Sequence, residues 1–227
     1  MAIIGINGKI GSGKDTVGSM IRYFTSECSN LNGGHFRTYL DFMERGQGNN
    51  DFQTWYNSDW EVKKFAGKLK KVASLLTGIP VSSFEDQEFK KSFLPDEWSY
   101  LPTDEIMTDG IGLGFKKMTV RELLQKMGTD ALRDHLHTNV WVNALFADYE
   151  EDSKWVITDL RFPNEYDSVK AWKGITVRVT RPGTEVGTHP SEIALDEFRF
   201  DWEIVNDGDL AELFEKVKIF MQHYSLV

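Results

Sequence analysis

The chain has 227 residues, 41% hydrophobic and 27% charged, which is typical of a globular protein long enough to bury a substantial core. Its 26 Lys and Arg against 35 Asp and Glu give a formal net charge of −9, which argues against broad electrostatic binding to nucleic acid or acidic membranes. The single cysteine, Cys28, excludes an internal disulfide, and the lack of a long apolar run or leader pattern predicts a cytoplasmic protein.

The amino-terminal segment has the pattern of a phosphate-binding loop. An apolar run at 3–6 predicts a buried strand, a glycine-rich stretch follows at 8–16, and apolar residues at helical spacing over 17–24 predict a helix. Glycines let the backbone N–H groups of such a loop point at phosphate oxygens, and Lys14 supplies a charge for the β- and γ-phosphates. Asp15 stands where the usual motif has a magnesium-binding Ser or Thr, and a threonine follows it. The alternative is a flexible surface turn before a helix.

Between this helix and the middle of the chain the patterns are weaker. Residues 36–43 are expected to form an edge strand, and 60–66 a second strand that stops at Gly67. A helix is expected around 81–91. The glycine-rich stretch 110–114 lacks the flanking strand and helix of a nucleotide fingerprint, so we expect a hairpin turn there.

A basic cluster lies at the start of the helix that is expected to follow Gly67. Lys68, Lys70 and Lys71 fall in its first turn, where cations are unfavourable because the free N–H groups of a helix start are partly positive. An anionic ligand would explain this cluster, and a solvated basic face is the alternative.

A capping box opens the next helix, because Thr119 and Glu122 have the spacing at which each side chain accepts a hydrogen bond from the backbone of the other. Arg121 lies on a second face of this helix together with Gln125 and Gly128. Residues 128–130 are expected to break the helix and restart another, which would leave backbone N–H groups free for a ligand.

Buried strands are expected in the carboxyl-terminal half at 154–159, 175–180 and 203–206. The first ends in Asp159, the form of a Walker B element, whose carboxylate lies beside a phosphate-binding loop. Residues 184–201 are expected to form an exposed excursion that could close over a substrate. Alternating strands and helices with a phosphate-binding loop after the first strand predict an α/β fold of the three-layer P-loop type with a parallel sheet.

Several stretches together form a more specific pattern. They are Gly-Ser-Gly-Lys-Asp-Thr (11–16), Val-Arg-Glu-Leu-Leu-Gln-Lys-Met-Gly-Thr-Asp (120–130), Trp-Val-Asn-Ala-Leu-Phe-Ala-Asp-Tyr (141–149) and Ile-Thr-Asp-Leu-Arg-Phe-Pro-Asn-Glu (157–165), with shorter stretches at 181–183, 189–192 and 204–213. Their identity and order resemble the deoxynucleoside monophosphate kinase family of T-even-like bacteriophages. Residues 36–60 and 79–118 match this family poorly and are interpreted as insertions.

The resemblance implies transfer of the γ-phosphoryl group of ATP to a deoxynucleoside 5′-monophosphate (dNMP), with Mg²⁺ held near Asp15 and Thr16, largely through water. Aspartate after the P-loop lysine also occurs in this family. The chain would be a single nucleoside monophosphate kinase-like domain over 1–227, with acceptor-binding helices and an insert at 67–130 and a lid at 184–201. Its partners would be small-molecule substrates, without nucleic acid or a membrane, and the resemblance suggests a homodimer.

The resemblance also suggests roles for individual residues. Those expected to be catalytic are Lys14, Arg121, Asp159 and Arg161. Those expected to bind ATP are Gly11, Ser12, Gly13, Lys14, Asp15 and Thr16 at the phosphates, with Arg181 and Asn206 at the adenine. Those expected to bind the dNMP are Lys70, Lys71, Arg121, Gln125, Gly128, Thr129, Trp141, Asp159, Arg161 and Glu165.

Alternatives stay open for the residues and for the whole chain. Trp141 lies on an apolar helix face and could belong to the core, while Arg121 and Arg181 could be solvated surface charges. The chain could instead be a small-metabolite kinase such as a dephospho-coenzyme A kinase, or a regulator that binds a nucleotide without turnover.

Overall fold

The structure is a computed structural model that describes residues 2–27, 29, 34–45, 58–100, 115–184 and 193–227. The chain divides into two compact units, Met1–Phe65 with Val142–Val227, and Ala66–Trp141. We call them the first and the second unit. The segment 67–130, expected to form the acceptor-binding helices and an insert, lies within the second unit.

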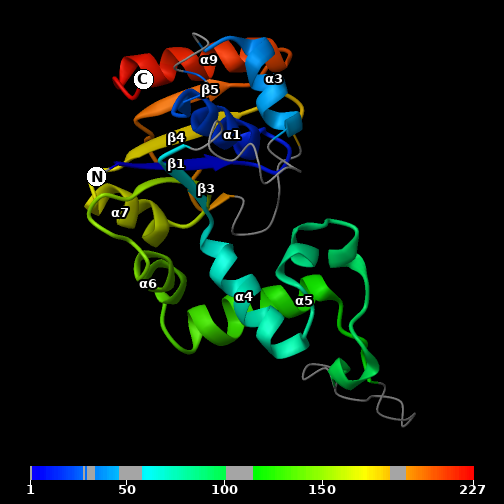
Figure 1. Ribbon diagram of the computed structural model, residues 1–227. Coiled ribbons are helices and arrows are strands. Elements are labelled where there is room, and N and C mark those ends of the chain that lie inside the picture. The colour runs from blue at the N-terminus through cyan, green and yellow to red at the C-terminus, as the bar shows by residue number, and fades with distance from the viewer. Residues whose placement is uncertain (1, 28, 30–33, 46–57, 101–114, 185–192) are drawn as a thin grey trace. The chain divides into compact units, whose positions relative to one another are not determined.

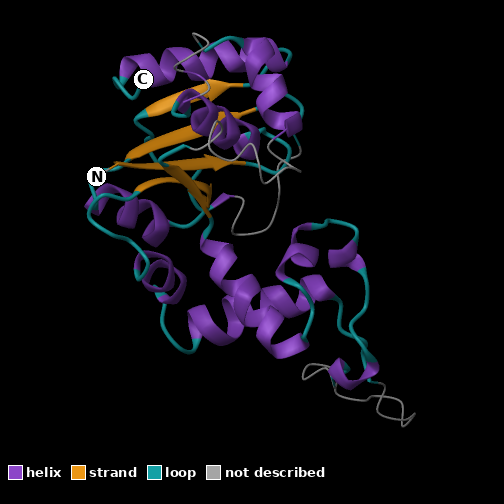
Figure 2. Ribbon diagram, viewed as in Figure 1, coloured by secondary structure: helices purple, strands orange, loops and turns teal. Residues whose placement is uncertain are grey.

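A fully parallel sheet forms the centre of the first unit (Figure 1; Figure 2). Its strands are β1 (Ala2–Gly8), β2 (Trp60–Lys63), β3 (Lys154–Leu160), β4 (Ile175–Thr180) and β5 (Trp202–Val205), in the order β2-β3-β1-β4-β5. The middle residues of β1, β3 and β4 are buried, as expected for short apolar runs in a parallel sheet. The predicted α/β class is therefore confirmed.

Helices cover both faces of this sheet (Figure 1). On one face, α1 (Lys14–Phe24) packs against α9 (Leu210–His223), and α3 (Phe36–Arg45) packs against α1. On the other face, α7 (Pro163–Ala171) lies against β1 and β4. Successive strand residues point to opposite faces, so each buried strand contributes side chains to both layers.

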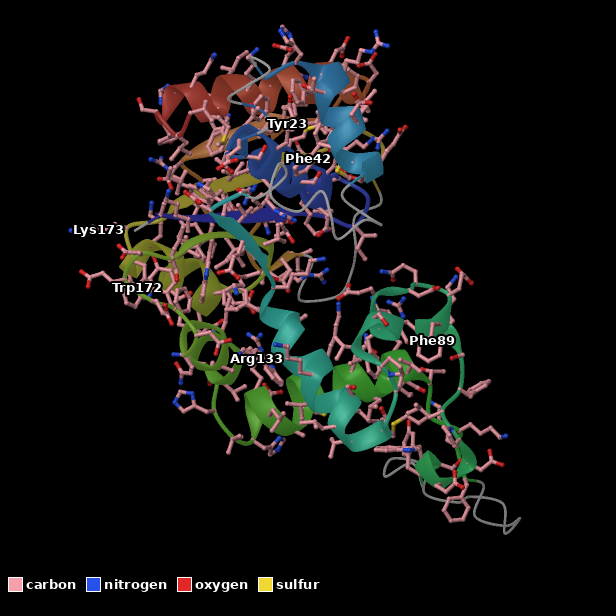
Figure 3. All side chains as sticks on the ribbon, in the orientation of Figure 1. Tyr23, Phe42, Phe89, Arg133, Trp172 and Lys173 are labelled. Carbon is pink, nitrogen blue, oxygen red and sulfur yellow. The ribbon has the colours of Figure 1, made fainter. Side chains whose placement is uncertain are left out.

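Aromatic rings fill the space between α1, α3 and α9. The Tyr23 ring lies 5.5 Å from the rings of Tyr39 and Phe42 of α3, and 5.8 Å from that of Phe214 of α9 (Figure 3). The expectation of an edge strand at 36–43 is wrong. Phe36, Tyr39 and Phe42 recur every three residues, which places them on one face of a helix; Tyr39 and Phe42 are buried there, and Phe36 is partly buried.

The end of β2 also differs from the expectation. β2 stops at Lys63 instead of running to 66, and α4 (Phe65–Thr77) begins two residues before Gly67. The helix starts early because a carboxylate oxygen of Asp159 accepts a hydrogen bond from the Phe65 N–H at 2.8 Å, which satisfies a free donor of the first turn. Of the basic cluster at 68–71, the first lysine alone stays in the first turn.

The second unit has a hydrophobic core of its own. Its elements are α4, the 3₁₀ turns η2 (Val81–Glu85), η3 (Phe89–Lys91) and η4 (Asp96–Trp98), α5 (Val120–Gln125), the π-helix η5 (Lys126–Asp134) and the start of α6 (Val140–Phe146). Phe84, Val120 and Leu123 are among the buried residues of this core. The single helix expected at 81–91 is wrong, because the Asp86 side chain accepts hydrogen bonds from the Glu88 and Phe89 N–H groups and starts a new turn.

The helix after Thr119 begins as predicted but continues further. The Thr119 N–H donates to the Glu122 carboxylate at 2.8 Å, and the Glu122 N–H donates to the Thr119 hydroxyl at 3.1 Å, so the capping box is confirmed. The expected break at 128–130 is wrong, since the chain passes through these residues as the π-helix η5. Gly128 is buried, and a Cβ there would lie 2.8 Å from a Leu69 methyl, so the glycine allows close packing against α4.

Some expectations fall outside the described residues. They concern Cys28, the hairpin turn at 110–114 and residues 185–192 of the expected lid. Among the helices that the structure describes, none combines the length and the apolar character that crossing a membrane requires.

The described end of the expected lid, 193–201, is anchored to the first unit. The Asp201 carboxylate accepts hydrogen bonds from the Lys170 ammonium of α7 and, at 2.8 Å each, from the N–H and hydroxyl of Thr176 on β4. The Arg178 guanidinium donates to backbone carbonyls of the same segment, including that of Asp196 at 3.1 Å. Burial by itself would raise the pKa of Asp201, but the contacts from Lys170 and Thr176 outweigh it and lower this pKa below its usual value.

Asp201→Asn should lower the free energy of unfolding at neutral pH, because the ion pair with Lys170 is lost. The folded-state pKa of Asp201 lies below the unfolded one, so its stabilisation is present above the ordinary aspartate pKa and disappears as pH falls through the folded value. Urea denaturation of wild type and variant at pH 7, 5, 4 and 3 measures this, and the difference should shrink at the acid end. Glu203→Gln on β5 serves as a control, and an Asp201→Asn effect that is constant with pH would contradict the assignment.

Candidate phosphate-binding site

The carboxyl ends of three neighbouring strands bring the chemically important residues of the first unit together. β2 and β1 both pair with β3, and Lys63 and Gly5 are aligned with the same residue, Ile157. The strands are parallel, so Lys64, Asp159 and the loop after β1 leave the sheet at one edge. Ligands of open parallel sheets bind at this edge.

The loop between β1 and α1 has the geometry of a phosphate-binding turn. Gly11 and Gly13 have φ of 81° and 97°, which side chains rarely allow. The Ser12 N–H donates to the Lys9 carbonyl at 3.1 Å and closes the turn. The Lys14 ammonium donates to the same carbonyl at 3.3 Å, so its side chain bends back over the loop. The loop, a helix amino end and a lysine therefore converge on one place.

Two observations indicate that this loop fits an anion. Ser12 is fully buried, and its hydroxyl has no hydrogen-bond partner among the described residues. Among the described residues, a Cβ added at Gly11 would meet a Thr184 methyl at 3.9 Å and nothing closer, so these residues leave room beside the backbone. A buried hydroxyl without a partner costs free energy, and a phosphate oxygen would satisfy it.

Asn206 braces the loop from the end of β5. Its side-chain amide donates to the Ser12 carbonyl at 2.9 Å, and its own N–H donates to the Thr180 carbonyl at 2.7 Å. A Cβ at Gly13 would lie 2.7 Å from the Asn206 amide nitrogen, so glycine is needed at 13 for this contact. The sequence placed Asn206 at the adenine, whereas the structure brings it against the backbone of the phosphate-binding loop.

Asp15 is held through one of its two carboxylate oxygens. That oxygen lies 2.9 Å from the Lys64 ammonium and accepts a hydrogen bond from the Thr158 hydroxyl at 3.0 Å. Burial would raise the pKa of Asp15, but Lys64, Thr158 and the charge of Lys14 outweigh it and lower this pKa below its usual value. Asp15 is therefore ionised at neutral pH.

Asp159 and Glu165 shape the backbone around the site. Asp159 accepts the Phe65 N–H, as described above, and so fixes the residue after Lys64. Glu165 is 2% exposed, and one carboxylate oxygen accepts the N–H groups of Arg161 at 2.9 Å and of Phe162 at 3.1 Å. This contact holds the turn that carries the half-buried Arg161.

The remaining residues that were expected to bind the acceptor belong to the second unit. Lys70 is 7% exposed, and its ammonium lies 2.6 Å from a Glu85 carboxylate oxygen. Arg121 is exposed, with a weak hydrogen bond of 3.4 Å to the Gln87 side chain. Lys71 and Gln125 are exposed and Thr129 is half-buried.

Trp141 has the packing of a core residue. It is 5% exposed, and its indole N–H donates to the Gly128 carbonyl at 2.8 Å. This bond satisfies a carbonyl of the π-helix, where the backbone pattern departs from the α-helix. The structure thus brings two of the expected acceptor residues, Trp141 and Gly128, into direct contact.

Lys64 and Thr158 lie at the site although no sequence pattern predicted a role for them. The expected strand at 60–66 placed Lys64 in its interior, so the residue did not stand out as one at a strand end. Thr158 was part of an apolar strand, and its hydroxyl gave no local signal. Position in the sequence was the one available clue. Lys64 follows the last residue of β2, and Thr158 precedes Asp159 near the end of β3.

The oxygen atoms of Asp15 and Thr16 suit a magnesium ion that also binds water and phosphate better than a metal ion held by protein side chains alone. Among the described residues no group of three or more His, Cys, Asp or Glu is arranged to hold a metal ion. Mg²⁺ commonly keeps several waters and binds one or two carboxylates together with substrate phosphates. Asp15, with one oxygen held by Lys64 and Thr158, and the half-buried Thr16 fit that kind of site.

Arg181, which was expected at the adenine, lies in the turn after β4 and is exposed.

Comparison with known proteins identifies the family to which the chain is similar. The model of the family described as deoxynucleotide monophosphate kinase matches residues 81–217, which is more than half of the chain. The phosphate-binding loop lies outside this range, so its geometry and the family match are independent observations.

Individual relatives have low to moderate sequence identity to this chain. The chain is 32% identical to the deoxynucleotide monophosphate kinase of Enterobacteria phage T4 over 118 residues, which cover 49% of each protein. It is 29% identical to that of Escherichia phage RB69 over 135 residues, covering 56% of this chain and 55% of the relative. The deoxynucleoside-5′-monophosphate kinase of Escherichia phage T5 is 23% identical over 234 residues, covering 91% and 90%. The chain thus spans about half the length of the T4 and RB69 relatives.

Asn206→Ala should weaken the binding of ATP and of inorganic tripolyphosphate by a similar factor, about tenfold for one lost buried hydrogen bond. The reason is that the Ser12–Gly13 backbone loses its brace. Isothermal titration calorimetry with both ligands measures this, and Asp207→Ala, at the exposed neighbouring position, is the control. A loss confined to ATP would assign Asn206 to the adenine instead.

Proposed function

We propose that this chain, which belongs to the deoxynucleotide monophosphate kinase family, transfers the γ-phosphoryl group of ATP to a dNMP to give the diphosphate and ADP. The observation that carries the proposal is the loop before α1, which holds the Lys14 ammonium and a buried Ser12 hydroxyl that has no hydrogen-bond partner among the described residues. This loop lies outside the segment that identifies the family. The family supplies the acceptor class, and the loop supplies a site for the donor.

The donor side is proposed to lie at the loop between β1 and α1. The backbone N–H groups from Gly11 to Thr16 and the Lys14 ammonium hold the triphosphate, while Asn206 keeps the loop in shape. Phosphoryl transfer needs positioning and charge neutralisation more than covalent help. A rigid loop with a fixed lysine meets both needs. Arg181 and the turn at Asn206 remain candidates for the adenine.

Arg161 and Arg121 are the arginines proposed to act on the acceptor. Arg161 is carried on a turn that Glu165 holds rigid, and Arg121 is exposed on α5. The guanidinium fork matches phosphate geometry and neutralises charge that develops in the transition state. Asp159 orients Arg161 or a metal-bound water. The further acceptor residues of the proposal are Lys70, Lys71, Gln125, Gly128, Thr129, Trp141 and Glu165.

The contacts of four of these residues limit what they can do. Lys70 is paired with Glu85, so it would grip the acceptor phosphate only by exchanging partners. Trp141 and Gly128 are buried against each other, so we propose that they shape the pocket wall. Glu165 acts through the backbone of Arg161 and is a positioning residue.

Bound Mg²⁺ would neutralise the charge of the transferring phosphoryl group. Asp15 and Thr16 are the residues proposed to hold it, mostly through water. The segment 184–201 is proposed to act as a lid that excludes water and so limits ATP hydrolysis. We also propose a cytoplasmic homodimer that acts on small molecules, without nucleic acid or a membrane as a partner.

The proposal is tested with an acceptor panel. ADP formation from ATP and Mg²⁺ is followed with each deoxynucleoside monophosphate and with dephospho-coenzyme A. Turnover with one or more dNMPs supports the proposal. Turnover with dephospho-coenzyme A alone would favour the small-metabolite kinase, and ATP binding without turnover on any acceptor would favour the regulator.

Lys14→Ala should abolish phosphoryl transfer to any accepted dNMP while the melting temperature stays close to that of the wild type. The lysine charge is lost at the donor phosphates, and its hydrogen bond to the Lys9 carbonyl adds little to the stability of the fold. Coupled ADP detection and circular dichroism measure the two properties. Lys9→Ala, whose exposed ammonium lies 3.5 Å from Asp196, is the matched control. Retained turnover in Lys14→Ala would exclude the loop as the donor site.

Arg161→Ala and Arg121→Ala should each lower kcat by about 10²–10³, because each removes a cation from the developing charge. The dissociation constant for ATP should change little, since both residues belong to the acceptor side. Steady-state kinetics with a saturating dNMP measures the first quantity and calorimetry the second. Arg133→Ala, in η5, is a control from the second unit. A wild-type kcat in either variant would remove that arginine from the mechanism.

A further inference from the structure

The residue directly after the P-loop lysine poses an electrostatic problem. The carboxylate of Asp15 forms an ion pair with the Lys64 ammonium, and it stands one residue from the lysine that is proposed to meet the phosphates of ATP. A carboxylate there repels a triphosphate, and the formal net charge of −9 adds to the unfavourable field.

Lys64 is placed to cancel this charge. Its ammonium lies 2.9 Å from one Asp15 oxygen, and the Thr158 hydroxyl contacts that same oxygen at 3.0 Å. The other oxygen has no hydrogen-bond partner among the described residues and stays open. The Asp15 side chain is 61% exposed, so neither the pair nor its environment is closed to an incoming ligand.

The backbone fixes Lys64 in this position. β2 ends at Lys63, and the next N–H after Lys64, that of Phe65, is held by Asp159 at the end of β3. The residue between these two anchors therefore lies beside the ends of β3 and β1. An exposed ion pair contributes little to stability, so stability alone gives a weak reason for this arrangement.

We propose that Lys64 is the counter-ion of Asp15 that lets the phosphate-binding loop accept a triphosphate despite its carboxylate. Lys64 holds one Asp15 oxygen, cancels its charge and leaves the other oxygen for a metal-bound water. It is a positioning residue that acts through Asp15. The inference rests on the proposed function only in taking ATP as the ligand of the loop.

The test is a double-mutant cycle on the binding of ATP in EDTA, measured by isothermal titration calorimetry with wild type, Lys64→Met, Asp15→Asn and the double variant. Lys64→Met should weaken binding about tenfold, the effect of roughly one uncompensated charge near the phosphates. Asp15→Asn should bind as tightly as the wild type or more tightly. The double variant should bind like Asp15→Asn, because no carboxylate remains to be neutralised.

Further variants separate charge from structure. Lys64→Arg should keep wild-type affinity, since the positive charge is retained. Lys63→Met, the same change at the neighbouring position where the lysine pairs with Glu61, should leave the ATP affinity unchanged. Thermal melting of every variant identifies any loss of fold.

Three results would overturn the inference. The first is an unchanged ATP affinity in Lys64→Met. The second is a loss of ATP affinity from Lys64→Met that is equally large in the Asp15→Asn background, which would mean that Lys64 contacts the nucleotide directly. The third is a loss of ATP affinity in Lys63→Met as large as that in Lys64→Met. Failure of the proposed function is a different result. In that case the wild type itself shows no ATP binding with Mg²⁺ and no transfer to any dNMP.

Discussion

The parallel pairing of β2, β3 and β1 is the constraint on which the candidate site depends. Because these strands run in the same direction at matched levels, each delivers the residues that follow it to one edge of the sheet. α1 can approach β3 closely because it carries Gly18, where a Cβ would lie 2.5 Å from a Thr158 methyl. This approach sets the contact between Asp15 and Thr158.

Two lysine side chains of this acidic protein, which has a formal net charge of −9, are buried and held at defined places. Lys14 is 9% exposed and Lys70 is 7% exposed, although a buried ammonium is costly unless it is paired or hydrogen-bonded. Lys14 is held by a loop carbonyl, and Lys70 by Glu85. Both lysines are thus kept at defined places by partners that offset the cost of their burial.

Each compact unit is stabilised by its own interior. The aromatic cluster around Tyr23 joins α1, α3 and α9 to the sheet of the first unit, while the core around Phe84 and Leu123 holds the second. The family match covers residues 81–217 and so includes parts of both units. The loop at Lys14, helices α4 and α5, and the turn at Arg161 come from separate stretches of the chain.

The sequence by itself determined the features that depend on neighbouring residues: the strand–loop–helix around Lys14, the capping box at Thr119 and the buried strand that carries Asp159, which ends one residue later than expected, at Leu160. The short apolar pattern at 36–43 was interpreted as a strand, whereas these residues belong to helix α3. The tertiary structure decided that Asp159 starts α4, 94 residues away, and that Asn206 braces Ser12, 194 residues away. It also decided the partner of Asp15. Such contacts are set by how strands align in the sheet, and no local spacing in the sequence encodes that alignment.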